Sequence, residues 1–252
     1  MTPMAQFEVK PLLPLHIGHY DISFTNQAAW MFVVLGAAAL FYSFAGLRRS
    51  LIPTRMQSIA ELSYEFVSHM ITSSSGEDGL MFFPFVFAIF VFVLLSNFFG
   101  LIPGSFSVTG QIAVTFALAL VVILTVIVTG FITHGIGFFK LFVPKAPIYL
   151  QFLLIPIEVI SFFTRLISLS VRLFANMLGG HTLLKVFAAF IVALGATAVT
   201  PKPWFAPLAV GPFLFEIAVY ALEVLIAFLQ AYVFAILTCI YLNEALHLHD
   251  NH

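Results

Sequence analysis

From Gly79 to Phe139, sixty-one consecutive residues contain no Asp, Glu, Lys or Arg. Soluble domains carry about 25% charged residues, whereas only 8% of the 252 residues of this chain are charged and 62% are hydrophobic. One membrane-crossing helix needs about 20 apolar residues. The uncharged run therefore predicts two membrane spans, joined by a turn at residues 101–110 that contains one Pro and two Gly residues.

The same reasoning, extended over the chain, predicts an all-α integral membrane protein that forms a single membrane domain. It has five membrane helices plus one amphipathic surface helix, and its last two helices are long and tilted as an antiparallel hairpin. The expected segments are an outer-side N-terminal segment (1–25), span 1 (28–47), the amphipathic surface helix (53–71), span 2 (80–102), span 3 (112–139), a long tilted helix (149–198), and a second long tilted helix with a cytoplasmic tail (211–247).

Lys and Arg residues set the expected orientation. Arg48 and Arg49 follow the first span, and short cytoplasmic flanks of membrane helices are enriched in such residues. With the N-terminus outside and the C-terminus in the cytoplasm, five Lys and Arg residues face the cytoplasm, two lie outside and three lie within the membrane. Asn97 and His134 stand alone in their spans, and we expect them to be hydrogen-bonded helix-packing groups.

Six polar residues recur at spacings of three or four positions along the first long helix, so they share one face. We call them the polar stripe: Glu158, Ser161, Arg165, Ser168, Arg172 and Asn176. The stripe extends over about 27 Å at about 1.5 Å per residue. A polar line of this length in an apolar helix is a candidate ion path.

His181 does not continue the polar stripe on an ideal helix. It lies about 140° around the helix from Asn176, at about 100° per residue. Either the helix is distorted at Gly179–Gly180, where we expect any kink, or His181 faces the second long helix.

The second long helix carries three polar residues at steps of seven, again on one face. Pro201 and Pro203 lie between the two long helices and predict a turn. Positions equally far from this turn then face each other in the hairpin. The facing pairs are Arg172 with Gln230, His181 with Glu223, and Lys185 with Glu216.

Charges in the hairpin balance in this arrangement. Three acids, Glu158, Glu216 and Glu223, oppose three cations, Arg165, Arg172 and Lys185. Each charge at the membrane centre costs about 2.5–3.5 kcal/mol, so pairing or water access is required. A purely structural role as staples of the hairpin is the alternative, although Ser and Thr would join helices at lower cost.

Proton chemistry divides these groups into two kinds. Glu and His side chains take up and release protons, whereas an arginine side chain stays protonated in proteins. Arg172 is therefore a fixed positive charge that repels protons and attracts a carboxylate. Titratable groups on both sides of it predict two half-paths separated by a barrier. Because the chain has no group that could carry a proton past Arg172, we infer a partner protein with a mobile carboxylate in the membrane.

Three segments closely resemble the subunit a family of F-type ATP synthases. They are SVRLFANMLGGH (170–181), SNFFGLIPG (96–104) and LEVLIAFLQAYVFAILTCIYL (222–242). The resemblance covers the five spans and the surface helix. It implies a stator subunit, not catalytic by itself and without a cofactor, whose tilted hairpin lies against a rotating c-ring.

The resemblance also implies roles for individual residues. Arg172 matches the essential arginine of the family. Protons would pass from the outer side to a c-ring carboxylate, and after rotation through lipid they would leave toward the cytoplasm beyond Arg172. The implied proton-pathway residues are Arg172, Asn176 and Gln230 beside it, Glu158 on the cytoplasmic side, and His181 and Glu223 on the outer side. Glu216, near the outer entry, and Ser168, on the polar stripe, complete the candidate proton pathway, although the resemblance assigns them no role.

The implied partners are the c-ring, the peripheral-stalk b subunits, the ATPase catalytic head reached through the stalks, and the lipid bilayer, with no nucleic acid. The expected location is the inner membrane of a bacterial cell, with the mitochondrial inner membrane as the alternative.

Three rival functions fit the sequence less well. A self-contained transporter would need its own substrate site or a repeat, and neither is visible. A haem-binding redox subunit would need paired axial ligands, and only His134 and His181 lie in the expected spans. A bare membrane scaffold would explain the hydrophobicity but not the polar residues of the two long helices. The choice between H⁺ and Na⁺ as the transported ion stays open.

Overall fold

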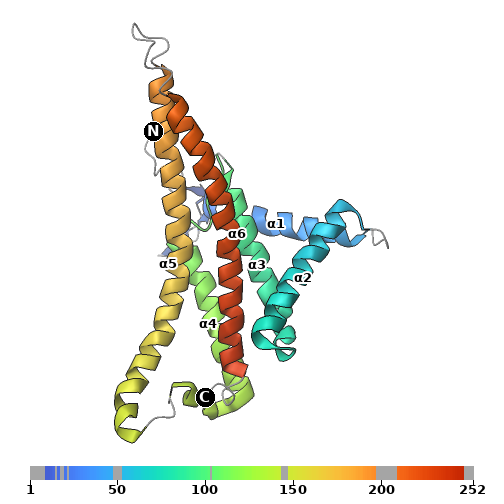
Figure 1. Ribbon diagram of the computed structural model, residues 1–252, viewed down its shortest axis with the longest axis vertical. Coiled ribbons are helices and arrows are strands. Elements are labelled where there is room, and N and C mark those ends of the chain that lie inside the picture. Colours follow the sequence, from blue (N-terminus) through green and yellow to red (C-terminus); the bar gives the residue numbers. More distant parts are fainter. Residues whose placement is uncertain are drawn as a thin grey trace.

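The computed structural model describes residues 9–14, 16–17, 20–21, 23–47, 53–102, 104–142, 147–196 and 209–246. Within these residues six α-helices follow one another (Figure 1). They are α1 (Asn26–Leu47), α2 (Arg55–Ser75), α3 (Phe83–Leu101), α4 (Ile112–His134), α5 (Ile148–Gly195) and α6 (Val210–Leu246), and two 3-10 helices, η2 (Asp78–Phe82) and η3 (Gly135–Phe142), flank α3 and α4.

Five of these helices, all except α2, are long and apolar enough to cross a membrane. The predicted all-α membrane fold is therefore confirmed. Several expected features fall outside the described residues: the turn around Pro201 and Pro203, the cationic flank at Arg48 and Arg49, and the end of the tail after Leu246.

Short strands precede α1, and the sequence did not predict them. β1 (Pro11–Leu13) pairs antiparallel with β4 (Phe24–Thr25), and β2 (His16–Ile17) pairs antiparallel with β3 (Tyr20–Asp21). The backbone of Lys10 also accepts a hydrogen bond from Asn26 N at 3.0 Å, at the first residue of α1. Strands of two or three residues carry too little alternation to be visible as a sequence pattern.

Helix α2 begins and ends with identifiable caps. Thr54 is extended, and its hydroxyl accepts a hydrogen bond from Gln57 N at 3.4 Å. At the other end Gly76 has φ of 68°, a conformation that favours glycine. The buried face of α2, with Val67, Met70 and Ile71, packs on α3 and α6, whereas its acidic residues stay exposed.

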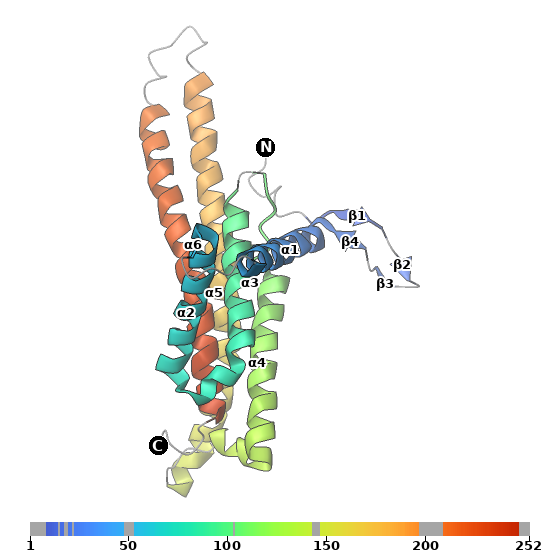
Figure 2. The same cartoon turned by 90° about the vertical axis from the view of Figure 1, so that its right-hand side faces the viewer.

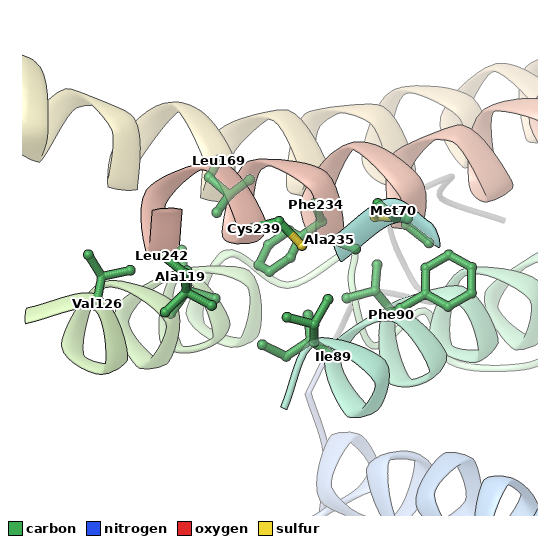
Figure 3. Close-up of a cluster of buried hydrophobic side chains, with 14 of the residues drawn as sticks. Met70, Ile89, Phe90, Ala119, Val126, Leu169, Phe234, Ala235, Cys239 and Leu242 are labelled. Atoms are coloured by element: carbon green, nitrogen blue, oxygen red, sulfur yellow. The ribbon is translucent and has the colours of Figure 1, made fainter. Parts of the chain in front are cut away.

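Helix α6 is the centre of the molecule, because it packs against α2, α3, α4 and α5. Small residues recur every four positions along its buried face, at Ala227, Ala231, Ala235 and Cys239. Such residues let helix backbones approach closely in a membrane. Figure 3 shows Phe234, Ala235, Cys239 and Leu242 of α6 meeting side chains of α2, α3, α4 and α5 in one apolar cluster.

The hairpin of α5 and α6 extends beyond the ends of α3 and α4 in both views (Figures 1 and 2). The tilted rings of Phe187 of α5 and Phe215 of α6 pack together at the extended end, with ring centroids 4.6 Å apart, and Arg165 pairs with Glu244 at the other end. These contacts show that the two helices are antiparallel. With 48 residues, α5 is about 72 Å long at about 1.5 Å per residue, more than twice the roughly 30 Å hydrocarbon core.

Helix α5 curves along its length and remains helical through Gly179 and Gly180, so the structure shows no break at the expected kink (Figure 1). Its N-terminal part diverges from α6 toward the bottom of Figure 1. In both views α1 lies across the direction of α5 and α6. A membrane normal parallel to α1 would therefore leave the hairpin strongly tilted.

Candidate functional site

Two hollows lie along the α5–α6 hairpin, and each is lined by a different part of the polar residues singled out above. The smaller one, which we call the inner cavity, has a volume of about 180 Å³. Its polar lining comes from Asn176 and His181 of α5 and Glu223 of α6, and Leu101 of α3 closes one side. The inner cavity therefore brings an acid and an imidazole from two helices to the wall of one cavity.

Glu223 is only 8% exposed, and its side chain lies against the backbone of α5 at Gly180. A Cβ added to Gly180 would stand 2.7 Å from the carboxyl carbon of Glu223 and would overlap the nearest carboxylate oxygen. Neither oxygen has a hydrogen-bond partner within the described residues. Because a buried carboxylate of this kind is costly in an apolar medium, water or a proton in the inner cavity has to compensate for it.

His181 turns away from the polar stripe, as its angle on the helix predicted. Its side chain is buried and lies between the inner cavity and α3. The ring nitrogen Nε2 stands 3.5 Å from the position of a Cβ on Gly100 of α3. His181 and Glu223 thus line one cavity, although no direct hydrogen bond joins them. The helix needs no distortion at Gly180 to bring them there.

The larger hollow, which we call the outer groove, has a volume of about 440 Å³ and lies between the diverging parts of α5 and α6. Four members of the polar stripe line it: Ser161, Arg165, Ser168 and Arg172. Arg172 is exposed in the isolated chain, and Nη2 donates a long hydrogen bond of 3.5 Å to the Ser168 hydroxyl. One helical turn separates Arg172 in the outer groove from Asn176 in the inner cavity.

Arg165 corrects the expected charge balance of three acids against three cations. Its guanidinium forms an ion pair with Glu244, and it lies 5.4 Å from the ring centroid of Tyr241. Glu244 was not among the expected hairpin charges, but it lies near the end of α6, which runs to Leu246 and brings this acid to the depth of Arg165. Arg165 is therefore neutralised from α6 by a residue outside the predicted set.

The remaining candidates are dispersed along the hairpin. Gln230 is buried on α6, and its amide nitrogen has no hydrogen-bond partner within the described residues. Glu158 and Glu216 are half-buried and lie outside the linings of the inner cavity and the outer groove. The part of the chain that the structure describes contains no group of three or more His, Cys, Asp or Glu side chains that could hold a metal ion.

Asn97 and His134 are packing groups, as predicted. Asn97 is fully buried on α3, where its amide donates to Ala227 O at 3.1 Å and accepts from the Thr109 hydroxyl at 2.8 Å. His134 Nε2 lies 3.0 Å from Leu246 O, which joins the ends of α4 and α6. Both side chains tie another helix to α6.

Comparison with known proteins identifies the family. The sequence model of the family described as ATP synthase A chain matches residues 28–243. The chain belongs to this family. It is therefore a multi-pass membrane protein that takes part in proton transport within an ATP synthase and is not itself a catalytic subunit.

Three curated relatives support this family over nearly the whole length, and each carries the name ATP synthase subunit a. The protein of Mesorhizobium japonicum is 54% identical over 251 residues, which cover 98% of this chain and 97% of that one. The relative from Chelativorans sp. is 54% identical and that from Agrobacterium fabrum 53% identical, each over 246 residues and 97% of both chains. The relatives are bacterial.

Proposed function

We propose that this chain provides protons with two offset half-channels to the carboxylates of a c-ring, and that Arg172 separates them. The inner cavity, which is named for its burial within the chain, serves as the half-channel on the outer side of the membrane. The outer groove serves as the half-channel toward the cytoplasm. The observation that carries this proposal is the position of Arg172, one helical turn from the inner cavity and on the wall of the outer groove.

The surroundings of Arg172 support a partner that carries a carboxylate. Large apolar side chains on the same helix are exposed in the isolated chain, among them Ile160, Phe163, Ile167 and Val171. A guanidinium on such a surface would face lipid at a high cost. Its long hydrogen bond to Ser168 leaves most of its five donors available. A membrane carboxylate of a c-ring subunit would supply both the opposite charge and the acceptors.

The residues then divide the transfer into two steps. On the outer side, a proton enters near Glu216, which lies outside the cavity lining, and Glu223 and His181 pass it through the inner cavity to a c-ring carboxylate near Asn176 and Gln230. The neutral carboxylic acid can then leave Arg172 and rotate through lipid.

After nearly a full turn the carboxylic acid meets the outer groove and releases its proton past Ser168 toward Glu158, which lies outside the groove lining. Arg172 stabilises the ionised carboxylate between the two steps and repels protons that would cross directly.

The proposal includes the setting of the chain. It places the N-terminus outside and the C-terminus in the cytoplasm of a bacterial cell, in the inner membrane. The c-ring lies against the α5–α6 hairpin, and peripheral-stalk b subunits hold the chain to the ATPase catalytic head. The excess of Lys and Arg on the cytoplasmic flanks supports this orientation.

Replacement of Arg172 tests the barrier. Arg172→Ala should abolish ATP-driven proton pumping in membrane vesicles, because no fixed cation would then bind the ionised carboxylate and separate the half-channels. Arg172→Lys should fail as well, since an ammonium lacks the planar fork of a guanidinium and loses its proton more readily when buried. Co-purification of the c-ring checks that each variant assembles. Near-normal pumping by assembled Arg172→Ala would refute the proposal.

A further inference from the structure

Ser107, in the loop between α3 and α4, has a buried hydroxyl without a protein partner. Its side chain is 1% exposed, and Oγ has no hydrogen bond within the described residues. Buried hydroxyls are nearly always paired with protein or with ordered water. The absence of a protein partner therefore indicates that a water molecule binds to this hydroxyl.

Two neighbouring hydroxyls in the same loop, unlike that of Ser107, have protein hydrogen-bond partners. Ser105 donates to backbone carbonyls at the end of α3, among them Ile102 O at 2.7 Å. Thr109 donates to the amide oxygen of Asn97 at 2.8 Å. Both side chains are as deeply buried as Ser107, to within a few percent. Only Ser107 of these three has a hydroxyl that serves no contact of the loop.

Gly100 connects Ser107 to His181. A Cβ on Gly100 would stand 3.2 Å from Ser107 Oγ and 3.5 Å from His181 Nε2. The two polar atoms therefore lie on the surface of the same small space, no farther apart than the sum of these two distances. Because residue 100 is glycine, its own side chain does not separate the two atoms, although Met177 Cε borders the same position at 3.3 Å. Buried polar atoms that are close but not hydrogen-bonded to each other can be bridged by a water molecule.

We propose that Ser107 holds a water molecule against His181 and that this water is the last step by which protons reach the inner cavity from the α3–α4 loop. The proposal rests on the proposed half-channel function and assigns its outer approach. Ser107 acts as a positioning residue, because it orients the water and does not itself gain or lose a net proton.

The transfer conserves protons and needs no other reactant. An incoming proton binds the water oxygen, and one of the water protons moves to Nε2 of His181. The water molecule is restored, and the imidazolium passes its proton into the inner cavity toward Glu223. Pumping driven by ATP runs the same steps in reverse. The Ser107 hydroxyl can donate to the water or accept from it, so it supports both directions.

Matched alanine variants test the assignment. Ser107→Ala should assemble normally, because no hydrogen bond within the loop is lost, and should lower ATP-driven proton pumping per assembled complex roughly 2- to 10-fold, as expected for one lost hydrogen bond. Ser107→Thr keeps the hydroxyl and should retain most of the pumping. Ser105→Ala is the control with the opposite pattern: it breaks loop hydrogen bonds, so the amount of assembled complex should fall while pumping per complex stays normal.

Each other result overturns the assignment. Normal pumping by Ser107→Ala would show that the hydroxyl holds no water needed for transport. A loss of assembly like that of Ser105→Ala would show a structural hydrogen bond instead. Equal losses in Ser107→Ala and Ser107→Thr would assign the effect to side-chain shape. Arg172→Ala in the same vesicles separates the two proposals, since normal pumping by that variant would refute the half-channels themselves.

Discussion

Gly180 makes a sharp test of the inner cavity, because the carboxyl group of Glu223 occupies the place of its missing side chain. In Gly180→Ala the added methyl would overlap the nearest carboxylate oxygen and stand 2.7 Å from the carboxyl carbon and 3.3 Å from Cγ of Glu223. The atoms in the way belong to the far end of a flexible side chain. Glu223 can therefore swing aside, and we expect the protein to fold and assemble.

The size of the effect follows from the geometry. Turning the Glu223 side chain about 30° away from its preferred rotamer costs about 0.5–1.5 kcal/mol, whereas alanine stabilises a helix interior by about 1 kcal/mol relative to glycine. The two contributions nearly cancel in stability. The added methyl excludes the original position of the carboxylate, however, and a displacement of about 1 Å in a reacting site can slow the reaction roughly 100-fold. Proton pumping per assembled complex should fall by a similar factor.

Two other glycines supply the controls. Gly179 lines the same cavity and Gly36 lies inside α1, and a Cβ at either position would meet no atom within 4 Å. Gly179→Ala and Gly36→Ala should gain the same helix propensity and leave pumping unchanged. The assay is ATP-driven acidification of inverted vesicles, normalised to the c-ring that co-purifies with each variant. Equal pumping by Gly180→Ala and Gly179→Ala would refute the argument that the position of Glu223 limits transport.

Two further predictions concern the relay and the orientation. His181→Ala and Glu223→Gln should each slow pumping, and the double variant should lose much less than the two single losses together, because coupled sites interact by roughly 0.5–3 kcal/mol. The exchange of His181→Glu with Glu223→His should recover more activity than either substitution alone. Strictly additive losses without recovery would show that the two residues act independently. In a Cys239→Ser background, a cysteine at exposed Lys10 should react with an impermeant reagent from outside intact cells and one at exposed Glu77 should not, whereas the reverse labelling would invert the topology.

The membrane fold was predictable from sequence because length and hydrophobicity alone determine it. An uncharged run such as 79–139 is not stable in water. In lipid, a single segment can form all of its backbone hydrogen bonds internally only as a helix. The antiparallel order of α5 and α6 was predictable as well. The contacts between Gly180 and Glu223 and between Phe187 and Phe215 lie close to the register expected from the turn.

The details of the site were less accessible, because they depend on where a third element lies. No spacing rule indicates that Glu223 packs on Gly180 or that Ser107 approaches His181 across Gly100. The pair of Arg165 with Glu244 was missed because only the acids deep in the second long helix were counted against the cations of the first. Acids that follow a long apolar helix are ambiguous in sequence, since helix ends are uncertain by a few residues.

Packing and proton chemistry in this chain are linked through the small residues of α6. Ala227, Ala231 and Ala235 let α3 approach α6, and Asn97 fixes that approach through its hydrogen bond to Ala227 O. The approach brings the C-terminal end of α3 against α5, so that Gly100 lies beside His181. The helical angle along α5 already turns His181 away from the polar stripe, and the end of α3 borders the side of the imidazole at Nε2. The surroundings of this imidazole are thus set by the contact of two other helices, and spacing along α5 alone does not indicate them.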